Sequence, residues 1–180
     1  MSRLLEQFKK AVRPELKTEL ALENDFAVPR VAKVTVNAGI GRLLQQQPKA
    51  LDQVVAALAR ITGQKPVLRR AKKAISAFKI REGQIVGASV TLRGKRMYDF
   101  LDKLVNVALP RTRDFRGISR KGFDGKGNYS LGIREHMVFP EQAQEEMDMP
   151  FGLEVSVVTS ARGDDAGYLL LKKLGFPFKD

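Results

Sequence analysis

The chain has 180 residues, 43% of them apolar, which is enough for one compact domain with a hydrophobic core and argues against a disordered chain. It has no cysteine, which excludes disulfide bonds and thiolate metal sites and favours a cytoplasmic protein. The net charge is +12, and no apolar run reaches the length of about 18 residues that a membrane-spanning helix needs.

The first part of the chain predicts a helix, a strand and a second helix. Residues 4–22 read as helical with an interruption near Pro14, because proline has no amide hydrogen to donate. Residues 30–38 alternate in polarity, as a half-buried strand does. Its inner face would carry Ala32, Val34, Val36 and Ala38, and its outer face Lys33, Thr35 and Asn37. Gly39 to Gly41 would end this strand, and residues 48–61 form an amphipathic helix.

The next segment predicts strands and a basic loop. Residues 66–70 read as a short strand that leads into a basic loop at 69–73. Residues 76–81 and 84–93 are expected to pair as a hairpin around Glu82-Gly83. In the second arm of that hairpin the apolar residues Val86, Ala88, Val90 and Leu92 would face inward, and Ser89, Thr91 and Arg93 outward.

The second half predicts two helices, two strands and long loops. Residues 95–109 form an amphipathic helix that Pro110 stops, and residues 111–129 a basic, glycine-rich loop with a short strand at its start. Residues 131–139 and 153–161 are strand candidates, and 140–150 is acidic and reads as loop or a short turn of helix. Asp164 and Asp165 suit the start of a last helix, where carboxylates meet the positive end of the helix dipole.

This alternation of elements favours an α+β fold, with a largely antiparallel sheet and helices on its apolar face, in a single domain over residues 1–180. The other sheet face would then be polar. Hydroxyls, amides and cations on such a face suit an RNA backbone, but they equally suit plain solvent. The pattern alone leaves both interpretations open.

The motifs give no sign of catalysis. Gly39 and Gly41 lack the third glycine of a dinucleotide site, since position 44 is Leu. The glycines at 122–127 are not followed by the Gly-Lys-Ser/Thr ending of a phosphate-binding loop. The only histidine, His136, has no set of metal ligands around it, so a structural or surface role is expected. The acidic clusters at 145–148 and 164–165 read as solvated surface and helix capping. We therefore expect no catalytic residue, no cofactor and no metal site.

The positive charge lies in the first part of the chain. Residues 60–96 hold 11 basic residues against one acid, Glu82. So dense a field favours a polyanion, with a solubilising surface as the alternative. Phe78 lies among these cations, where it could stack on an unpaired base or belong to the core. We take residues 30–96 as the RNA-binding part; a weaker basic region holds Arg111, Arg113, Arg116, Arg120 and Lys121.

Seven segments, in chain order and spread over about residues 5–180, resemble the bacterial form of the universal large-subunit ribosomal protein numbered five. These are Val34–Gly41, Ile61–Pro66, Arg70–Ser76, Leu104–Arg111, Asp114–Gly117, Phe123–Tyr129 and Leu174–Phe178. The resemblance implies an antiparallel sheet flanked by helices, binding to 5S ribosomal RNA, and contact with 23S ribosomal RNA in the central protuberance.

The resemblance also implies roles for residues. It places 5S RNA contacts on Lys33, Asn37, Gln64, Lys65, Ser76, Phe78, Arg81 and Thr91, to which the strand pattern adds Thr35 and Arg93. It implies that the basic loop, with Arg69, Arg70, Lys72, Lys73 and Lys79, approaches P-site tRNA. It implies that Arg111, Arg113 and Arg116 face a protein of the small-subunit head, and that large-subunit proteins are further neighbours.

Three other functions remain open at the level of sequence. They are an RNA-modifying enzyme on the same basic face, a general binder of nucleic acid or anionic membrane, and an RNA chaperone outside the ribosome. The first would need a catalytic group or cofactor pocket, and the others would bind without preference for 5S RNA.

Overall fold

The computed structural model describes residues 2–142 and 150–179. Five strands form one sheet in the order β2–β3–β1–β5–β4, and every neighbouring pair is antiparallel. The strands are β1 (Val31–Gly39), β2 (Val67–Arg70), β3 (Ile85–Leu92), β4 (Tyr129–Ile133) and β5 (Leu153–Thr159). The α-helices are α1 (Arg3–Gln7), α2 (Arg13–Glu19), α3 (Gly41–Gln46), α4 (Ala50–Thr62), α5 (Gly94–Lys103) and α6 (Asp164–Lys173). The predicted α+β class with an antiparallel sheet is confirmed.

Short helical turns complete the chain. Two are π-helical, η1 (Phe8–Val12) and η4 (Leu104–Ala108). Five are 3₁₀ turns: η2 (Asp25–Ala27), η3 (Ser76–Phe78), η5 (Arg120–Gly122), η6 (His136–Val138) and η7 (Pro140–Gln142). No helix among the described residues is both long and apolar enough to cross a membrane.

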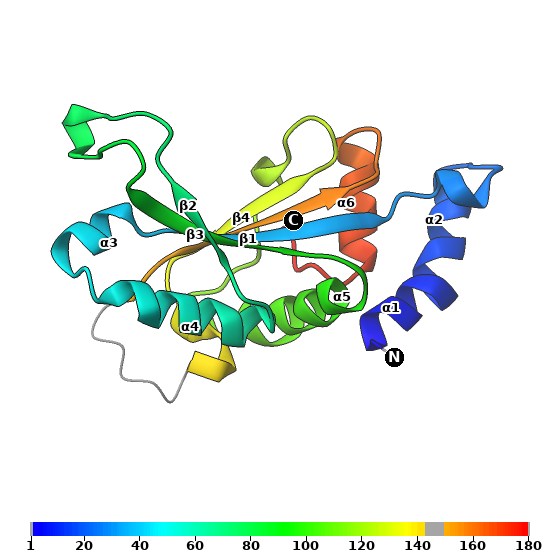
Figure 1. Ribbon diagram of the computed structural model, residues 1–180. Coiled ribbons are helices and arrows are strands. Elements are labelled where there is room, and N and C mark those ends of the chain that lie inside the picture. The colour runs from blue at the N-terminus through cyan, green and yellow to red at the C-terminus, as the bar shows by residue number, and fades with distance from the viewer. Residues whose placement is uncertain (1, 143–149, 180) are drawn as a thin grey trace.

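The hydrophobic core lies between the sheet and the helices α1, α4 and α5, which lie on the lower side of the sheet in Figure 1. Val34 and Val36 of β1 are fully buried in it, together with Leu58 of α4 and Leu101 of α5. Burying one such side chain contributes about 1.5–3 kcal/mol. The predicted inner stripes of the helices at 48–61 and 95–109 are confirmed by this packing, which leaves the upper side of the sheet free of these helices.

A β-bulge corrects the predicted inner face of β1. The register between β1 and β5 shifts between Val31 and Lys33. An extra residue in one strand reverses the alternation beyond it, so Val31 is buried while Ala32 is exposed. The prediction that Ala32 faces the core is therefore wrong, whereas Val34 and the residues after it follow the expected pattern.

The predicted hairpin is also corrected. On the side of β3 away from β1, the partner strand is β2, with Leu68 opposite Ala88, and not residues 76–81. Residues 71–84 leave the sheet as an excursion, here called the arm, which rises above the sheet in Figure 1. Its base is closed because Ala71 N donates to Gln84 O at 2.8 Å and Gly83 N donates to Ala71 O at 2.9 Å. The alternation of 76–81 reflects one isolated bridge, Ile75 with Ile80, around η3.

The N-terminal helical segment is interrupted as predicted, by a widened turn. Arg13 N donates to Phe8 O, five residues back, which defines the π turn η1 directly before Pro14. The proline ring crowds the carbonyl four residues before it and Pro14 has no N–H, so a wider turn relieves the strain. After β1, where only a break at Gly39–Gly41 was expected, the chain instead forms α3, with Leu43 and Leu44 half-buried.

The second half differs from prediction in three places. Residues 111–128 hold no strand at their start, only η5 and two isolated bridges, from Ile118 to Phe178 and from Phe123 to Tyr129. β4 ends at Ile133, because the next residues turn into η6. The acidic segment predicted at 140–150 begins with the short helical turn η7, and its residues 143–149 lie outside the described residues.

The last helix begins at Asp164 as predicted, but the carboxylate of Asp164 binds elsewhere. It accepts hydrogen bonds from Gly125 N at 3.1 Å and Gly127 N at 2.9 Å. These belong to residues 124–127, here called the glycine loop. Thr159 Oγ1 also donates to Gly127 O at 2.7 Å, so β5 and α6 together hold this loop. Within the loop, hydrogen bonds from the Asn128 side chain and from backbone N–H groups lower the pKa of the Asp124 carboxyl.

Candidate nucleic-acid interface

The sheet presents an open face on the side away from α4 and α5. Register partners bring its polar residues together: Thr35 lies opposite Thr91 and Ser156, and Asn37 lies opposite Ser89 and Glu154. Ser130 of β4 pairs with Ser156, and their hydroxyl oxygens are 3.0 Å apart. The prediction that the outer residues of two strands share one face is confirmed. The open face is thus a continuous polar surface across four strands.

Cations and an amide border this face. Gln64 Nε2 donates to Thr91 O at 3.4 Å, so the segment before β2 lies against the outer end of β3. Lys65 is exposed beside it, and Arg93 Nη1 donates to Ala32 O at 3.5 Å at the start of β1. Lys33 is half-buried between the strands. The structure therefore brings the predicted sheet residues into one region.

Arg69 lies on the open face and not in the basic loop where it was predicted. It belongs to β2, and its Nε donates to Ser89 Oγ at 2.7 Å. The guanidinium covers the serine, which explains why Ser89, predicted to face outward, is only 5% exposed. Arg70, the last residue of β2, is exposed at the root of the arm.

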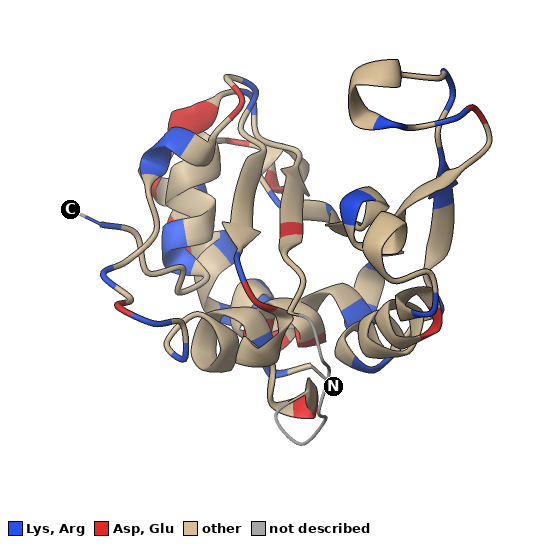
Figure 2. Cartoon of the chain, turned by 90° about the vertical axis from the view of Figure 1, so that its left-hand side faces the viewer, with Lys and Arg blue, Asp and Glu red and all other residues tan. Residues whose placement is uncertain are grey.

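The arm presents the remaining predicted residues to solvent. Exposed on it are Lys72, Lys73, Ser76, Phe78, Lys79 and Arg81. The Phe78 side chain is 65% exposed, so the alternative that it belongs to the core is wrong. Gln45 Nε2 of α3 donates to Phe78 O at 2.9 Å, which ties the tip of the arm to the body of the protein. Figure 2 shows Lys and Arg on β2, the edge strand of the sheet, and along the arm beyond it.

These cations are available to a ligand. Among residues 2–142 and 150–179, no Lys or Arg of the open face or the arm forms an ion pair with a described acid. The same part of the chain holds no cluster of three or more His, Cys, Asp or Glu that could bind a metal ion. His136 is buried, its ring stacks on Phe151 at 4.1 Å, and burial lowers its pKa. Its role is structural, in line with the sequence expectation.

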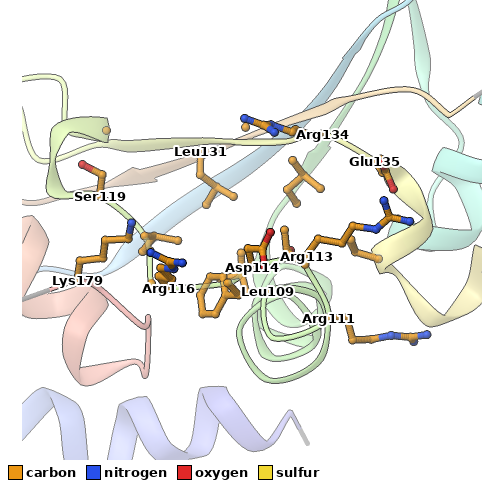
Figure 3. A pocket seen from close by; sticks show the side chains of 18 of the residues that line it. Leu109, Arg111, Arg113, Asp114, Arg116, Ser119, Leu131, Arg134, Glu135 and Lys179 are labelled. Atoms are coloured by element: carbon orange, nitrogen blue, oxygen red, sulfur yellow. The ribbon is translucent and has the colours of Figure 1, made fainter.

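Arg111, Arg113 and Arg116 lie at a second surface. They line an open pocket of about 980 Å³ between the 109–122 segment and β4. Leu131 points from β4 into this pocket toward Leu109, on the side of the sheet opposite the open face (Figure 3). The structure thus separates these arginines from the predicted RNA contacts.

Sequence reasoning missed Glu154, Ser130 and Ser156 on the open face. The strand at 153–161 was predicted, but none of its residues was assigned to a face, and the strand predicted at 131–139 began after Ser130. The signal was present, because Glu154 and Ser156 alternate with the buried Val155 and Val157. What the sequence could not supply was the strand order that places β5 beside β1.

Comparisons with known proteins agree with this arrangement. Residues 24–81 match the family model described as ribosomal protein L5, and residues 85–178 match the ribosomal L5P family C-terminus. The chain is 57% identical over 178 residues to the large ribosomal subunit protein uL5 of Halothermothrix orenii, covering 99% of each chain. It is 52% identical over 180 residues to uL5 of Herpetosiphon aurantiacus, covering both chains fully, and 54% identical over 178 residues to that of Chloroflexus aurantiacus, covering 99% of this chain and 98% of the relative. The two matched segments contribute strands to one sheet.

Proposed function

Because this chain belongs to the bacterial ribosomal protein L5 family, we propose that its open face and arm bind 5S ribosomal RNA in the large ribosomal subunit. The family consists of structural constituents of the large subunit and not of enzymes, so the protein belongs to the cytoplasmic ribosome. Ribosomal RNA and neighbouring ribosomal proteins are its partners.

The observation that carries the proposal is the register of the open face. Three neighbouring strands bring Thr91, Thr35 and Ser156 into one row and Ser89, Asn37 and Glu154 into the next. Hydroxyls and amides in rows can bond ribose hydroxyls and phosphate oxygens, which is how proteins read the shape of folded RNA. The helices leave this face uncovered, and the cationic arm continues it.

The proposed contacts divide by chemistry. Phosphates would be neutralised by the cations Lys33, Lys65, Arg69, Arg81 and Arg93, and hydrogen bonds to ribose or base would come from Thr35, Asn37, Gln64, Ser76 and Thr91. Phe78 is exposed at the tip of the arm, where its ring can stack on an unpaired base. The binding is therefore electrostatic over most of the surface and specific at few points.

The outer part of the arm is proposed to contact P-site tRNA and 23S ribosomal RNA. Lys72, Lys73 and Lys79 are exposed there, and Arg70 is exposed at the root of the arm beside Arg69. The arm itself projects beyond the sheet (Figure 2). The pocket with Arg111, Arg113 and Arg116 is proposed to face a protein of the small-subunit head. Its position on the other side of β4 supports this, because RNA held on the open face would not cover it.

A salt titration of 5S ribosomal RNA binding tests the proposal. Each neutralised phosphate should lower the logarithm of the association constant by about 0.7–0.9 per tenfold rise in salt. The variant Lys33→Gln should reduce the slope of log affinity against log salt by the contribution of about one phosphate. Lys10→Gln, on the N-terminal helical segment, should leave the slope unchanged. A salt-independent affinity would contradict the proposal.

Competitors separate the other functions. Unlabelled 5S RNA should displace the labelled RNA at much lower concentration than unrelated RNA or acidic vesicles. Equal competition by all three would instead show a general binder of polyanions. Sedimentation with large subunits in cell extract separates a ribosomal constituent from a free RNA chaperone.

A further inference from the structure

Glu154 is the single acidic residue of the five strands, and it lies on the open face. Its side chain is exposed, whereas Leu153 and Val155 on either side are buried on the opposite face. A carboxylate here repels phosphate, so it weakens the interaction that the cations of the open face provide.

The carboxylate is held in place without being neutralised. Asn37 Nδ2 donates to Glu154 Oε2 at 3.4 Å, across the register of β1 and β5. No described Lys or Arg forms an ion pair with it. On its other side, Glu154 lies opposite Gly132 of β4, where an added Cβ would meet nothing within 4 Å. The acceptor oxygens of Glu154 therefore border open space on the face of the sheet.

The cation of this strand pair, Lys33, lies at a distance from this point. Along β1, Asn37 is four residues from Lys33, which corresponds to about 13 Å. Lys33 has Val158 as its partner on β5, and Thr35 with Ser156 lies between the two rows. Along β1 and β5 the open face thus changes from the cation Lys33, through the hydroxyls of Thr35 and Ser156, to the amide and carboxylate of Asn37 and Glu154. Arg69 lies over Ser89, at the far end of that last row.

From this arrangement we infer that Glu154 determines specificity in RNA binding, by excluding phosphate and accepting a hydrogen bond from an RNA donor. A carboxylate can only accept, and phosphate at neutral pH offers no donor of comparable kind. The donors of RNA are the ribose 2′-hydroxyl and the amino and imino groups of the bases. Glu154 would thereby fix which way the RNA lies across the sheet. This inference rests on the proposed function and adds a residue and a ligand chemistry to it.

The first experiment measures discrimination. Affinities of the wild type and Glu154→Gln for 5S ribosomal RNA and for an unrelated RNA of equal length are compared at one salt concentration. Glu154→Gln should bind the unrelated RNA more tightly and 5S RNA no better, so that the ratio of affinities falls about tenfold. The matched control, Asp52→Asn, removes one exposed carboxylate from α4 on the opposite side of the sheet and should leave the ratio unchanged.

The outcomes separate this inference from the proposed function. A wild type without preference for 5S RNA would overturn the proposed function. A wild-type preference that Glu154→Gln retains in full would overturn only the role of Glu154. Thermal unfolding of Glu154→Gln should match the wild type; if the ratio falls only together with the unfolding temperature, the role is structural and the inference fails.

The second experiment distinguishes the two kinds of donor. In 5S RNA, guanosines inside the protein footprint are replaced by inosine, which lacks the exocyclic amine, or by 2′-deoxyguanosine, which lacks the hydroxyl. One replacement should weaken binding of the wild type several-fold and have no effect on Glu154→Ala, which keeps no side-chain acceptor, and which replacement it is identifies the donor. If both proteins respond equally to both replacements, Glu154 contacts neither donor and the inference is overturned.

Discussion

A Cβ atom on Gly167 would lie 2.6 Å from the carbonyl oxygen of Gly127, so α6 and the glycine loop meet backbone against backbone. Gly167→Ala should therefore force the loop away from the helix and lower the free energy of unfolding by about 1–3 kcal/mol. Urea unfolding measures this. Gly39→Ala is the control, because a Cβ there meets nothing within 4 Å. An equal loss in both variants would refute the close approach as the cause.

Asp164 should stabilise the glycine loop and not only its own helix. Asp164→Ala removes the acceptor for Gly125 N and Gly127 N, which should lower stability by about 1–3 kcal/mol and speed hydrogen exchange of these two amides. Asp165→Ala serves as the neighbour control. The Asp165 side chain is fully exposed, and its ion pair with Arg120, at 3.7 Å from Nη2, lies in solvent. Exchange that is equally fast in both variants would assign the effect to the helix start instead.

His136 should make the fold sensitive to mild acid. Burial lowers the pKa of the folded histidine below the ordinary 6.5 of the unfolded chain. As pH falls through 6.5 the unfolded chain takes up a proton that the folded chain does not, so stability present above 6.5 is lost below it. The slope is at most about 1.4 kcal/mol per pH unit.

The measurement is urea unfolding at pH values between 7 and 5, a window above the titration of the carboxyl groups Asp25 and Asp124, whose pKa values are lowered. His136→Phe keeps a ring against Phe151 and has no proton to gain. Its stability should vary less with pH than that of the wild type, even if it is lower throughout. Parallel curves for both proteins would show that His136 does not cause the dependence.

Gln45 should fix the orientation of the arm. Gln45→Ala removes the donor to Phe78 O, so exchange of backbone amides at 75–80 should quicken and 5S RNA affinity should fall several-fold, because the arm then loses more conformational freedom on binding. The global unfolding temperature should not change. Gln46→Ala, the exposed next residue of α3, should behave as wild type.

Thr91 should contribute to RNA binding and not to folding. Its side chain is exposed in the middle row of the open face, so Thr91→Ala should weaken 5S RNA binding about threefold to tenfold and change stability by less than about 0.5 kcal/mol. Thr18→Ala, on α2, controls for the loss of an exposed hydroxyl. Earlier melting of Thr91→Ala with normal binding of the folded fraction would contradict its assignment.

The parts of the fold that sequence could predict are those in which local polarity decides the structure. The valines of β1 and β5 and the apolar stripes of α4 and α5 repeat with the period of their element, and the core that they form was foreseeable. The hairpin failed because residues 76–81 alternate as a strand does, whereas the partner of β3 is set by the register of Val67–Arg70. Only a tertiary contact distinguishes the two.

The same limit applies to the candidate site. Thr35, Asn37 and Thr91 could be assigned to an outer face from alternation alone, and their common face followed from pairing. Neither the contact of Gln45 with Phe78, 33 residues away, nor that of Asn37 with Glu154, 117 residues away, has a local sequence signal. The covering of Ser89 by Arg69 likewise depends on β2 lying at the edge of the sheet.

The two attachments of the arm restrict how its length can vary among related chains. The base is closed at Ala71, and the tip is tied through Phe78 to α3, so the stretch between them must span a fixed gap. An inserted residue before Phe78 would shift its carbonyl away from Gln45, and one between Lys79 and Gly83 would disturb the bridge of Ile80 with Ile75 or the bond of Gly83 to Ala71. Insertions and deletions in this lineage should therefore be rare within the arm.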